Sequence, residues 1–272
     1  MGRSLSEPGR RHDRTTAPCR RGGTGVEWEP RSGKGRWRGF DPLTTRKEGP
    51  VVKKDLEIDL VMALVARAVQ PFPPAAMFQL FDEGHTSLFE QLVACIISIR
   101  TLDEVTVPTA RKLLGLAPTP AGMVRLSPQE IDQQIHDSSF HERKAWQIHR
   151  IAQQVLDEHG GELPCDREVL MAFSGVGVKC ANLALGVACG EPQGISVDVH
   201  VHRVTNRWGY VAAGSPERTT VLLEAKLPRR FWLEINRLLV PFGKHICTGR
   251  LPRCSTCPVL EMCRQVGVDK HR

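Results

Sequence analysis

Four cysteines close to the C-terminus constrain the fold of this chain more than any other feature of its sequence. They follow the spacing C-x6-C-x2-C-x5-C and are Cys247, Cys254, Cys257 and Cys263. Four thiolates bind either Zn²⁺ or an iron–sulfur cluster. The spacing alone leaves both open, because structural zinc sites usually show two close pairs and only Cys254 and Cys257 form one here. This C-terminal segment is therefore expected to fold around a metal centre.

The chain ahead of these cysteines shows the patterns of a series of short helices. Apolar residues recur at helical spacing from Leu56 to Ala68, and 71-PFPP-74 ends that helix. Thr101 and Glu104 have capping-box spacing, so a helix is expected to start there, with Pro108 kinking it or delaying its start. No strand pattern is found, which predicts an all-α fold. Further helices are expected near 87–99, 127–136, 143–158, 166–173, 178–189, 198–208, 217–225 and 229–242.

The turn 174-SGVG-177 lies directly before the predicted helix 178–189. Glycine tolerates positive φ and leaves the backbone bare, and the unpaired N–H groups at a helix start can hold a phosphate oxygen. Lys179 lies in the first turn, where the helix dipole disfavours a cation, and a partly desolvated amine held there is available as a nucleophile. Asp198 begins the next predicted helix and is interpreted as a carboxylate that faces this lysine. The plain alternatives are a tight turn for the glycines and an N-cap role for Asp198.

Three stretches taken together resemble the helix-hairpin-helix DNA glycosylases of the endonuclease III branch. They are 173-FSGVGVKCAN-182, 197-VDVHVHRVTNR-207 and 247-CTGRLPRCSTCPVLEMC-263, in the order and spacing of that family. The resemblance covers about residues 56–268. It implies a two-lobed all-α fold: a disordered basic leader (1–54), a six-helix lobe with the hairpin (81–191), and a second lobe. That second lobe is built from 55–80 and 192–272 and carries a [4Fe–4S] cluster on the four cysteines.

The resemblance also implies a chemistry in which a damaged base is flipped out of the duplex before it is removed. Lys179 would attack C1′ of the deoxyribose, form a Schiff base and cut the strand by β-elimination. Asp198 would stabilise the positive charge that develops on the sugar. Gly175 and Gly177 match the hairpin glycines that hold backbone phosphate. The implied protein is a bifunctional DNA glycosylase and AP lyase for oxidised pyrimidines, whose partner is double-stranded DNA with damaged bases or abasic sites.

Several positions depart from the family pattern or extend it. Arg100 stands where the family usually has a gap-filling glutamine, which leaves the lesion range and the opposite-base preference open. Asp103 matches the family's acidic residue. Phe140 matches the position of an apolar wedge, with a buried anchor as the alternative. Arg250 and Arg253 lie in the loop between the first two cysteines, where they either contact DNA phosphate or form a solvated basic loop.

The basic character of the chain is confined to its first 54 residues. They carry 14 Lys and Arg against 6 Asp and Glu, whereas the remaining residues carry 23 and 24. This leader is expected to be disordered, either as a basic arm for nucleic acid or as a segment without function. No apolar run has membrane length and no secretory signal is found. We expect an intracellular monomer, cytoplasmic and associated with the nucleoid in a bacterium, that does not enter membranes.

The other cysteines and two histidines are expected to be structural. Disulfides are not expected in an intracellular chain, so four cysteines are interpreted as packing residues: Cys95, Cys165, Cys180 and Cys189. His200 and His202 do not share a helix face and predict no metal site.

Two other functions stay open. One is a monofunctional glycosylase of the adenine-specific, mismatch-directed branch, which lacks the lysine. The other is a non-catalytic DNA-binding module, which has no need to keep both Lys179 and Asp198.

Overall fold

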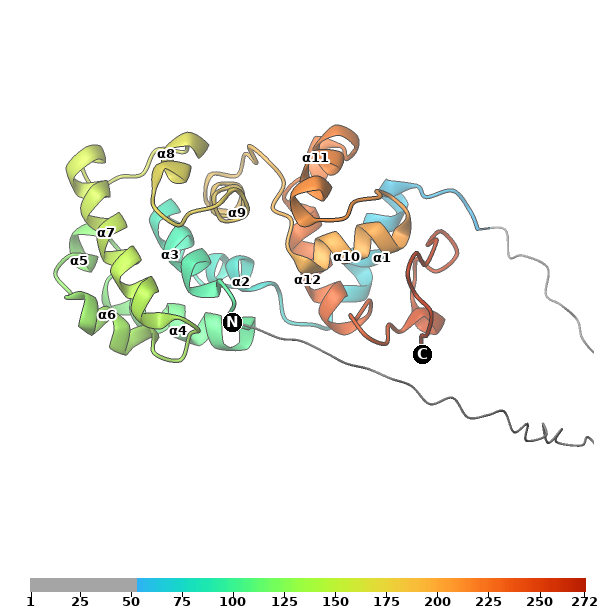
Figure 1. Cartoon of the computed structure of the whole chain (residues 1–272), viewed down its shortest axis with the longest axis horizontal. Helices are drawn as coiled ribbons and strands as arrows, with labels where there is room; N and C mark the ends of the chain where they lie inside the picture. The colour runs from blue at the N-terminus through green and yellow to red at the C-terminus, as the bar shows by residue number, and fades with distance from the viewer. Residues whose placement is uncertain (1–52) are drawn as a thin grey trace, which may run out of the picture. The chain divides into compact units, whose positions relative to one another are not determined.

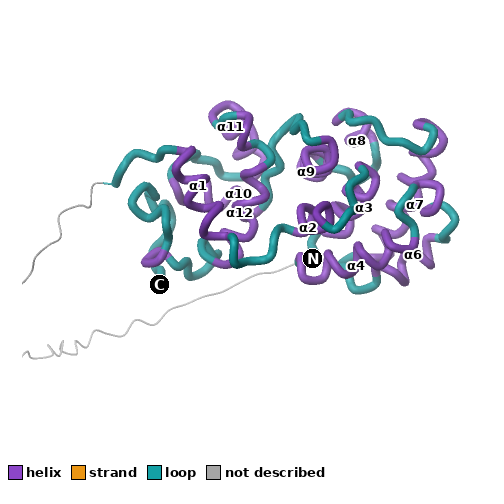
Figure 2. The backbone as a smooth tube through the Cα atoms, turned by 180° about the vertical axis from the view of Figure 1, so that it is seen from behind, coloured by secondary structure: helices purple, strands orange, loops and turns teal. Residues whose placement is uncertain are grey.

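The computed structural model describes residues 53–272, and within this range the predicted all-α fold is confirmed. Figure 2 shows only helices and loops in the described part of the chain. The predicted disordered leader, residues 1–54, lies outside the described residues except for Lys53 and Lys54. The α-helices are α1 (Ile58–Val69), α2 (Ala76–Asp82), α3 (Leu88–Ser98), α4 (Asp103–Leu116), α5 (Pro120–Met123), α6 (Pro128–Ile135), α7 (His141–His159), α8 (Arg167–Ala172), α9 (Val178–Cys189), α10 (Val199–Trp208), α11 (Pro216–Lys226) and α12 (Glu234–His245), with short 3-10 helices η1 (Arg229–Phe231) and η2 (Cys254–Thr256).

Helix α3 forms the centre of a first hydrophobic core. Every residue from Leu88 to Ile97 is buried, which is expected for a helix that is apolar on nearly all sides. A capping box between Ser87 and Glu90 satisfies the backbone N–H groups at its start. Helices α2, α4, α7 and α9 pack against α3, so the helix that carries Lys179 rests directly on the best-buried element of the molecule.

A second core joins the two ends of the described chain. Figure 1 shows α1 beside α10 and α12, and Val61 and Val65 of α1 share this core with Trp208 and Phe242. The C-terminal residues after α12 pack against the same core. The two cores lie within one unit of residues 51–272. The expected lobe boundaries, 81–191 with 55–80 and 192–272, stay a prediction.

Two local predictions about helix ends are wrong. Helix α4 begins at Asp103 with Leu102 at its N-cap and no side-chain cap, so Thr101 and Glu104 form no capping box. The Thr101 hydroxyl oxygen instead accepts hydrogen bonds from other segments, which spacing along the chain cannot reveal. Helix α4 continues through Pro108, so its start is not delayed to that proline, and the expected kink stays a prediction. The single helix expected over 229–242 is divided into η1 and α12, and the short helices α2 and α5 were not predicted.

Two cysteines expected to be packing residues form a disulfide instead. Cys165 precedes α8 and Cys189 ends α9, and the two are joined although 24 residues separate them. Helices α8 and α9 pack against each other, which brings the two ends of the hairpin together. The prediction was wrong because it relied on the expected compartment and not on this contact. Cys95 and Cys180 are free and buried, as expected for packing residues.

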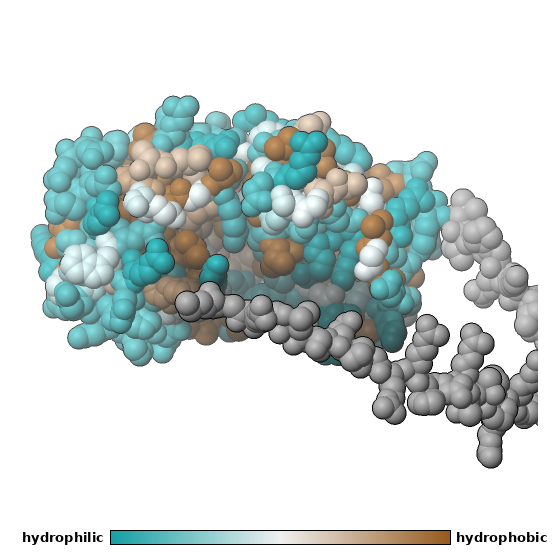
Figure 3. Space-filling view, in the orientation of Figure 1, coloured by the Kyte–Doolittle hydropathy of each residue, from teal (hydrophilic) through white to brown (hydrophobic). Residues whose placement is uncertain are grey.

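On the face that Figure 3 shows, the described chain is mostly hydrophilic, with hydrophobic side chains in patches. None of the helices within residues 53–272 has the length and apolar character needed to cross a membrane. A few large apolar side chains are nonetheless exposed, among them Leu102, Phe140 and Trp146. Of these, Leu102 lines the cavity described below, and Phe140 lies against Arg100, which also lines it.

Candidate functional site

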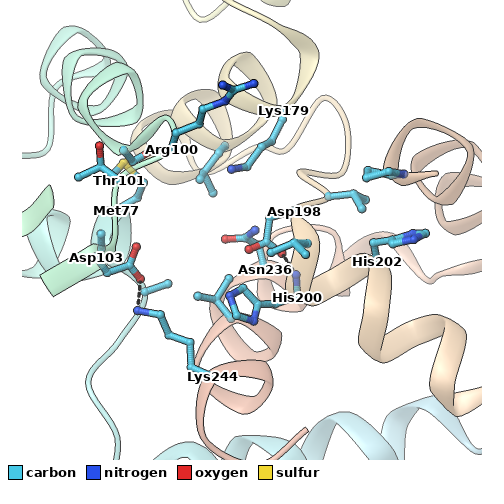
Figure 4. A pocket seen from close by; sticks show the side chains of 18 of the residues that line it. Met77, Arg100, Thr101, Asp103, Lys179, Asp198, His200, His202, Asn236 and Lys244 are labelled. Atoms are coloured by element: carbon cyan, nitrogen blue, oxygen red, sulfur yellow. Dashed lines mark hydrogen bonds and ion pairs between the residues drawn. The ribbon is translucent and has the colours of Figure 1, made fainter. Parts of the chain in front are cut away.

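An open cavity of about 710 Å³ is lined by four of the residues that the sequence singled out. Lys179, Asp198, Arg100 and Asp103 all line it, although they come from three different segments of the chain. Figure 4 shows these side chains around a common space. The structure therefore brings together the lysine and the carboxylate that the sequence paired.

Lys179 lies in the first turn of α9 and is exposed. The partial desolvation expected from the sequence is not found, because the cavity is open to solvent. The N-cap of α9 is Gly177, which offers no side-chain oxygen to the first backbone N–H groups. These groups therefore stay available to an external acceptor, and they lie within one turn of the lysine.

The two hairpin glycines serve different purposes. Gly175 has φ +82°, and a Cβ atom there would lie 2.8 Å from the amide nitrogen of Gln147, which itself donates a hydrogen bond to the Ser174 carbonyl at 2.9 Å. This position needs glycine for conformation and packing. A Cβ at Gly177 would meet nothing within 4 Å. Glycine there leaves open space in front of the helix N-terminus, which suits the close approach of a phosphate.

Asp198 is the N-cap of α10. Its carboxylate accepts hydrogen bonds from the backbone N–H groups of His200 at 2.9 Å and Val201 at 2.8 Å. The N-cap interpretation is therefore confirmed. It does not compete with a role in the cavity, because the half-buried side chain also lines that space. The two helix bonds fix the direction in which the carboxylate points.

Buried hydrogen bonds hold the segment before Asp198 against the helix of Lys179. The Ser196 hydroxyl donates to the Lys179 carbonyl at 3.1 Å, and the Asn182 amide donates to the Ile195 carbonyl at 3.1 Å. From α12, the Asn236 amide donates to the Ser196 carbonyl at 3.2 Å. Sequence reasoning missed these three side chains, whose partners lie 13 to 40 residues away. Together they set the register between lysine and carboxylate.

A second cation occupies the far side of the cavity. Lys244 of α12 donates to the carboxylates of Asp103 and Glu104, each at 3.1 Å. Asp103 is thus half of an ion pair that joins α4 to α12. Nearby, burial lowers the pKa of His200 although the Asp198 carboxylate opposes this shift. The sequence offered no signal for Lys244, because its partners lie about 140 residues away.

Arg100 and Phe140 come from different loops and meet each other. Both have positive φ, +53° and +59°, which is uncommon for residues other than glycine and concentrates at functional sites. The Arg100 guanidinium lies 5.6 Å from the centre of the Phe140 ring. Phe140 is 54% exposed, so the alternative of a buried anchor is wrong. Arg100 lines the cavity, and the exposed Phe140 ring lies beside it.

Lys144 holds the loops of this pair in place, and the sequence did not reveal it. Its side chain is buried, with 4% exposure. The ammonium donates to the carbonyls of Ile97 and Ile99 at 2.7 and 2.8 Å and to the Thr101 hydroxyl at 3.0 Å. The lysine comes from the first turn of α7, directly after Phe140. Burial lowers its pKa from 10.5 to about 8.

The four C-terminal cysteines surround a small cavity of their own, and none of them is in a disulfide. Burial raises the pKa of the Cys257 thiol to about 12. The first cysteine is positioned by Arg207, which the sequence did not single out. Its guanidinium donates to the carbonyls of Thr248 and Gly249, both at 2.6 Å.

Arg250 and Arg253 are exposed on the loop that follows Cys247. The backbone N–H of Arg253 donates to the Ile246 carbonyl at 2.9 Å, which closes this loop. The structure does not bring these two arginines into the cavity with Lys179. Arg250 lines a separate surface pocket, and Arg253 borders the cavity of the four cysteines.

Comparison with known proteins shows which family has this architecture. Residues 93–229 match the HhH-GPD superfamily of base excision DNA repair proteins. Endonuclease III of Thermotoga maritima is 35% identical over 185 residues, which cover 67% of this chain and 86% of that protein. The chain belongs to the endonuclease III-type HhH-GPD superfamily. The expected helix-hairpin-helix fold is thereby confirmed.

Other endonuclease III relatives match to different extents. Endonuclease III-like protein 1 of Bos taurus is 32% identical over 89% of this chain and 76% of its own length. The chain spans about half, 47%, of the chloroplastic endonuclease III homolog 2 of Arabidopsis thaliana, at 38% identity. Among solved structures, a trapped covalent intermediate of endonuclease III with DNA matches with a TM-score of 0.67 and 28% identity. That match covers 76% of this chain and 94% of the other.

Proposed function

We propose that this endonuclease III-type protein is a bifunctional DNA glycosylase and AP lyase that removes oxidised pyrimidines from duplex DNA. The observation that carries the proposal is the open cavity that the Lys179 amine and the Asp198 carboxylate both line, directly behind the hairpin glycines. Both are held by their own helix starts and by buried hydrogen bonds. The similarity to an endonuclease III captured as a covalent intermediate with DNA supports it.

The chemistry assigns one role to each residue. The Lys179 amine attacks C1′ of the flipped nucleotide, the glycosidic bond breaks, and the base leaves with the bonding electrons and takes up a proton. Asp198 stabilises the positive charge on the sugar during this step. The amine then loses its protons as the sugar ring opens, which gives an imine at C1′. Removal of a proton from C2′ breaks the C3′–O bond, so the strand is cut 3′ to the lesion.

The DNA would be held at backbone phosphates and opened by the loop pair. The unpaired N–H groups at the start of α9 donate hydrogen bonds to a phosphate beside Gly177. Arg250 and Arg253 bind phosphates farther along the strand. Phe140 enters the stack as an apolar wedge, and Arg100 fills the space left by the flipped nucleotide. These contacts need no sequence reading, which suits an enzyme that must search all DNA.

An abasic-site duplex tests the proposal most directly. Purified protein is incubated with an end-labelled abasic duplex, and separately with a duplex that contains one oxidised pyrimidine, with and without borohydride. We expect strand cleavage on both substrates, and a covalent protein–DNA adduct when borohydride reduces the imine. An intact strand with a released base would instead identify a monofunctional glycosylase. Tight binding without either product would identify a non-catalytic DNA-binding module.

We also propose that Cys247, Cys254, Cys257 and Cys263 hold a [4Fe–4S] cluster. A single tetrahedral zinc ion with bonds of 2.3 Å would place its sulfur ligands about 3.8 Å apart. Within residues 53–272, no three of these sulfur atoms lie within 4.8 Å of one another, which fits a larger centre. Burial raises the pKa of the Cys257 and Cys263 thiols, so a metal centre is needed to hold them as thiolates. When bound, the cluster would cross-link the C-terminal segment.

Replacing Cys254 with serine is expected to remove the visible absorbance of the cluster and to destabilise the C-terminal residues. The reason is that metal binding at such a site contributes directly to folding. Absorbance, iron content and thermal unfolding are measured together. Cys180→Ser, a buried free cysteine outside the set, should keep the iron. Purified wild-type protein with stoichiometric zinc and no iron would show that the cluster assignment is wrong.

Phe140→Ala is expected to slow the processing of a paired damaged base and to spare a preformed abasic site. The exposed ring contributes only to opening the stack, which costs a few kcal/mol per step. Single-turnover rates on the two substrates are compared. Arg100→Gln should shift the opposite-base preference without changing the rate on the abasic site. Equal losses on both substrates for Phe140→Ala would mean that the ring is needed for folding instead.

Like Phe140→Ala, Lys144→Met is expected to slow the processing of a paired damaged base and to spare a preformed abasic site. The reason is that the substitution releases the loops that carry Arg100 and Phe140. Loss of its three buried hydrogen bonds should slow paired-lesion processing about tenfold. Lys112→Met, an exposed lysine on α4, is the matched control and should behave as wild type. A stable Lys144→Met protein with an unchanged ratio of the two rates would contradict this role.

The low pKa of Lys144 gives a second measurement. In the folded protein it titrates at about 8, and in the unfolded chain near the ordinary 10.5. Between these pH values the unfolded state binds more protons, so this lysine makes the free energy of unfolding rise with pH. The rise should be present in wild type and Lys112→Met and missing in Lys144→Met.

A further inference from the structure

Three potential metal ligands gather where α6 ends and α7 begins, outside the cavity that holds Lys179. Asp132 lies on α6, His136 directly follows that helix, and His141 is the first residue of α7. One donor atom from each lies within 4.8 Å of the other two. The His141 ring nitrogen Nδ1 lies 2.5 Å from the Asp132 carboxylate, and the rings of His136 and His141 are 4.4 Å apart between centres.

We propose that Asp132, His136 and His141 form a binding site for Zn²⁺. Asp132 and His136 are four residues apart, and His136 keeps right-handed helical angles, so both side chains share one helix face. Two imidazole nitrogens and one carboxylate oxygen are ligands that zinc prefers, with bonds of about 2.0 to 2.2 Å. Harder cations such as Ca²⁺ and Mg²⁺ prefer oxygen ligands throughout.

The ion would replace the hydrogen bond between His141 and Asp132. Each of the two atoms then bonds to zinc, and the imidazole proton moves to the other ring nitrogen, so His141 stays neutral. His136 is exposed and the other two side chains are half-buried. The fourth position of the tetrahedron therefore faces solvent and takes a water molecule. The exposed position suits a structural clamp that exchanges its metal with solution.

The backbone between the ligands is already held, which reduces the cost of forming the site. Ser138 is buried, and its N–H donates to the Ile135 carbonyl at 2.8 Å. The N–H of Ser139 donates to the Thr101 hydroxyl at 3.2 Å. The donors therefore start close to one another, and side-chain rotation closes the remaining distance without rearranging the loop.

Zinc would cross-link the two helices on either side of loop 137–140. Phe140 immediately precedes His141, so bound zinc would fix the backbone that carries the exposed Phe140 ring. The site itself is independent of the proposed function, whereas any consequence for DNA opening rests on it. Bound metal should make the loop more rigid and so change how the ring enters a duplex, without touching Lys179 or Asp198.

The proposal is tested by zinc binding to the full protein. Loosely held metal is removed with a chelator, and zinc is then added in equilibrium dialysis. We expect wild type to bind one equivalent more than His136→Ala and His141→Ala. His149→Ala, two turns farther along α7, should bind as wild type. Because only differences between variants are compared, the metal content of the four cysteines does not affect the result.

Two further measurements, Co²⁺ absorption and amide hydrogen exchange, make the test decisive. Co²⁺ at this site should give visible bands without the intense near-ultraviolet absorption of thiolate ligands, which separates it from the cysteines. Zinc should slow amide hydrogen exchange in loop 137–140 of wild type and leave His136→Ala unchanged. Equal zinc binding by wild type and both histidine variants, or none by wild type at millimolar zinc, would overturn the site. Neither result would depend on glycosylase activity.

Discussion

Lys179→Gln is expected to abolish both strand cleavage and the borohydride-trapped adduct while leaving DNA affinity nearly unchanged. Glutamine keeps a similar length and a hydrogen-bonding tip but has no nucleophilic amine. Loss of a nucleophile lowers the rate by on the order of 10⁴-fold or more. Affinity should persist because the hairpin glycines and the N–H groups at the start of α9 are untouched.

The cavity itself offers the matched control for this variant. Lys244 is the other lysine that lines it, and its amine is engaged by Asp103 and Glu104. Lys244→Gln should therefore still form the trapped adduct. Gel shift, single-turnover cleavage and trapping are measured for both proteins. If Lys179→Gln formed the adduct at the wild-type rate and Lys244→Gln did not, Lys244 would be the nucleophile and the role assigned to Lys179 would be wrong.

Asp198→Asn is expected to reduce the rate of base removal by on the order of 100-fold to 1,000-fold, the usual effect of losing one electrostatic contact to a transition state. Stability should change little. The asparagine oxygen can still accept the hydrogen bonds from His200 and Val201, and asparagine is as good an N-cap as aspartate. Only the charge that faces the sugar is lost.

Capping and catalysis can be separated with a second aspartate. Asp166 caps α8 through two similar hydrogen bonds but does not line the cavity. Asp198→Ala and Asp166→Ala should each cost about 1 kcal/mol of stability. Only Asp198→Ala should also lose the chemical step. Equal rates for Asp198→Asn and wild type, measured at saturating enzyme, would reduce Asp198 to a helix cap.

Local patterns in the sequence predicted much of this structure correctly. Helix α9 spans 178–189 as expected. A glycine turn marks its start, and the apolar run that follows marks its length. The exposure of Phe140 agrees with the wedge prediction. Lys179 and Asp198 line one cavity, as their pairing required. The helix follows from local spacing, whereas the wedge and the roles of Lys179 and Asp198 came from the resemblance to the endonuclease III branch.

The contacts that hold the site required the tertiary structure. Lys144 carries an ordinary lysine pattern in the sequence, yet packing buries it and gives it partners 43 to 47 residues away. The disulfide between Cys165 and Cys189 and the ion pair of Lys244 likewise join distant segments. Thr101 forms no capping box because its hydroxyl serves these long-range contacts instead.

The sequence by itself therefore determined most of the helices and the four-cysteine set, through short-range periodicity and motif spacing. Its motifs indicated the candidate reactive pair through their resemblance to a known family. The tertiary structure alone decided how the pair is aligned and which loops surround it. Ser196 and Asn236 align Asp198 with Lys179, and Lys144 connects the loops of Arg100 and Phe140. Such partners are chosen by the packing of whole helices, and packing depends on distances in space that no local spacing along the chain records.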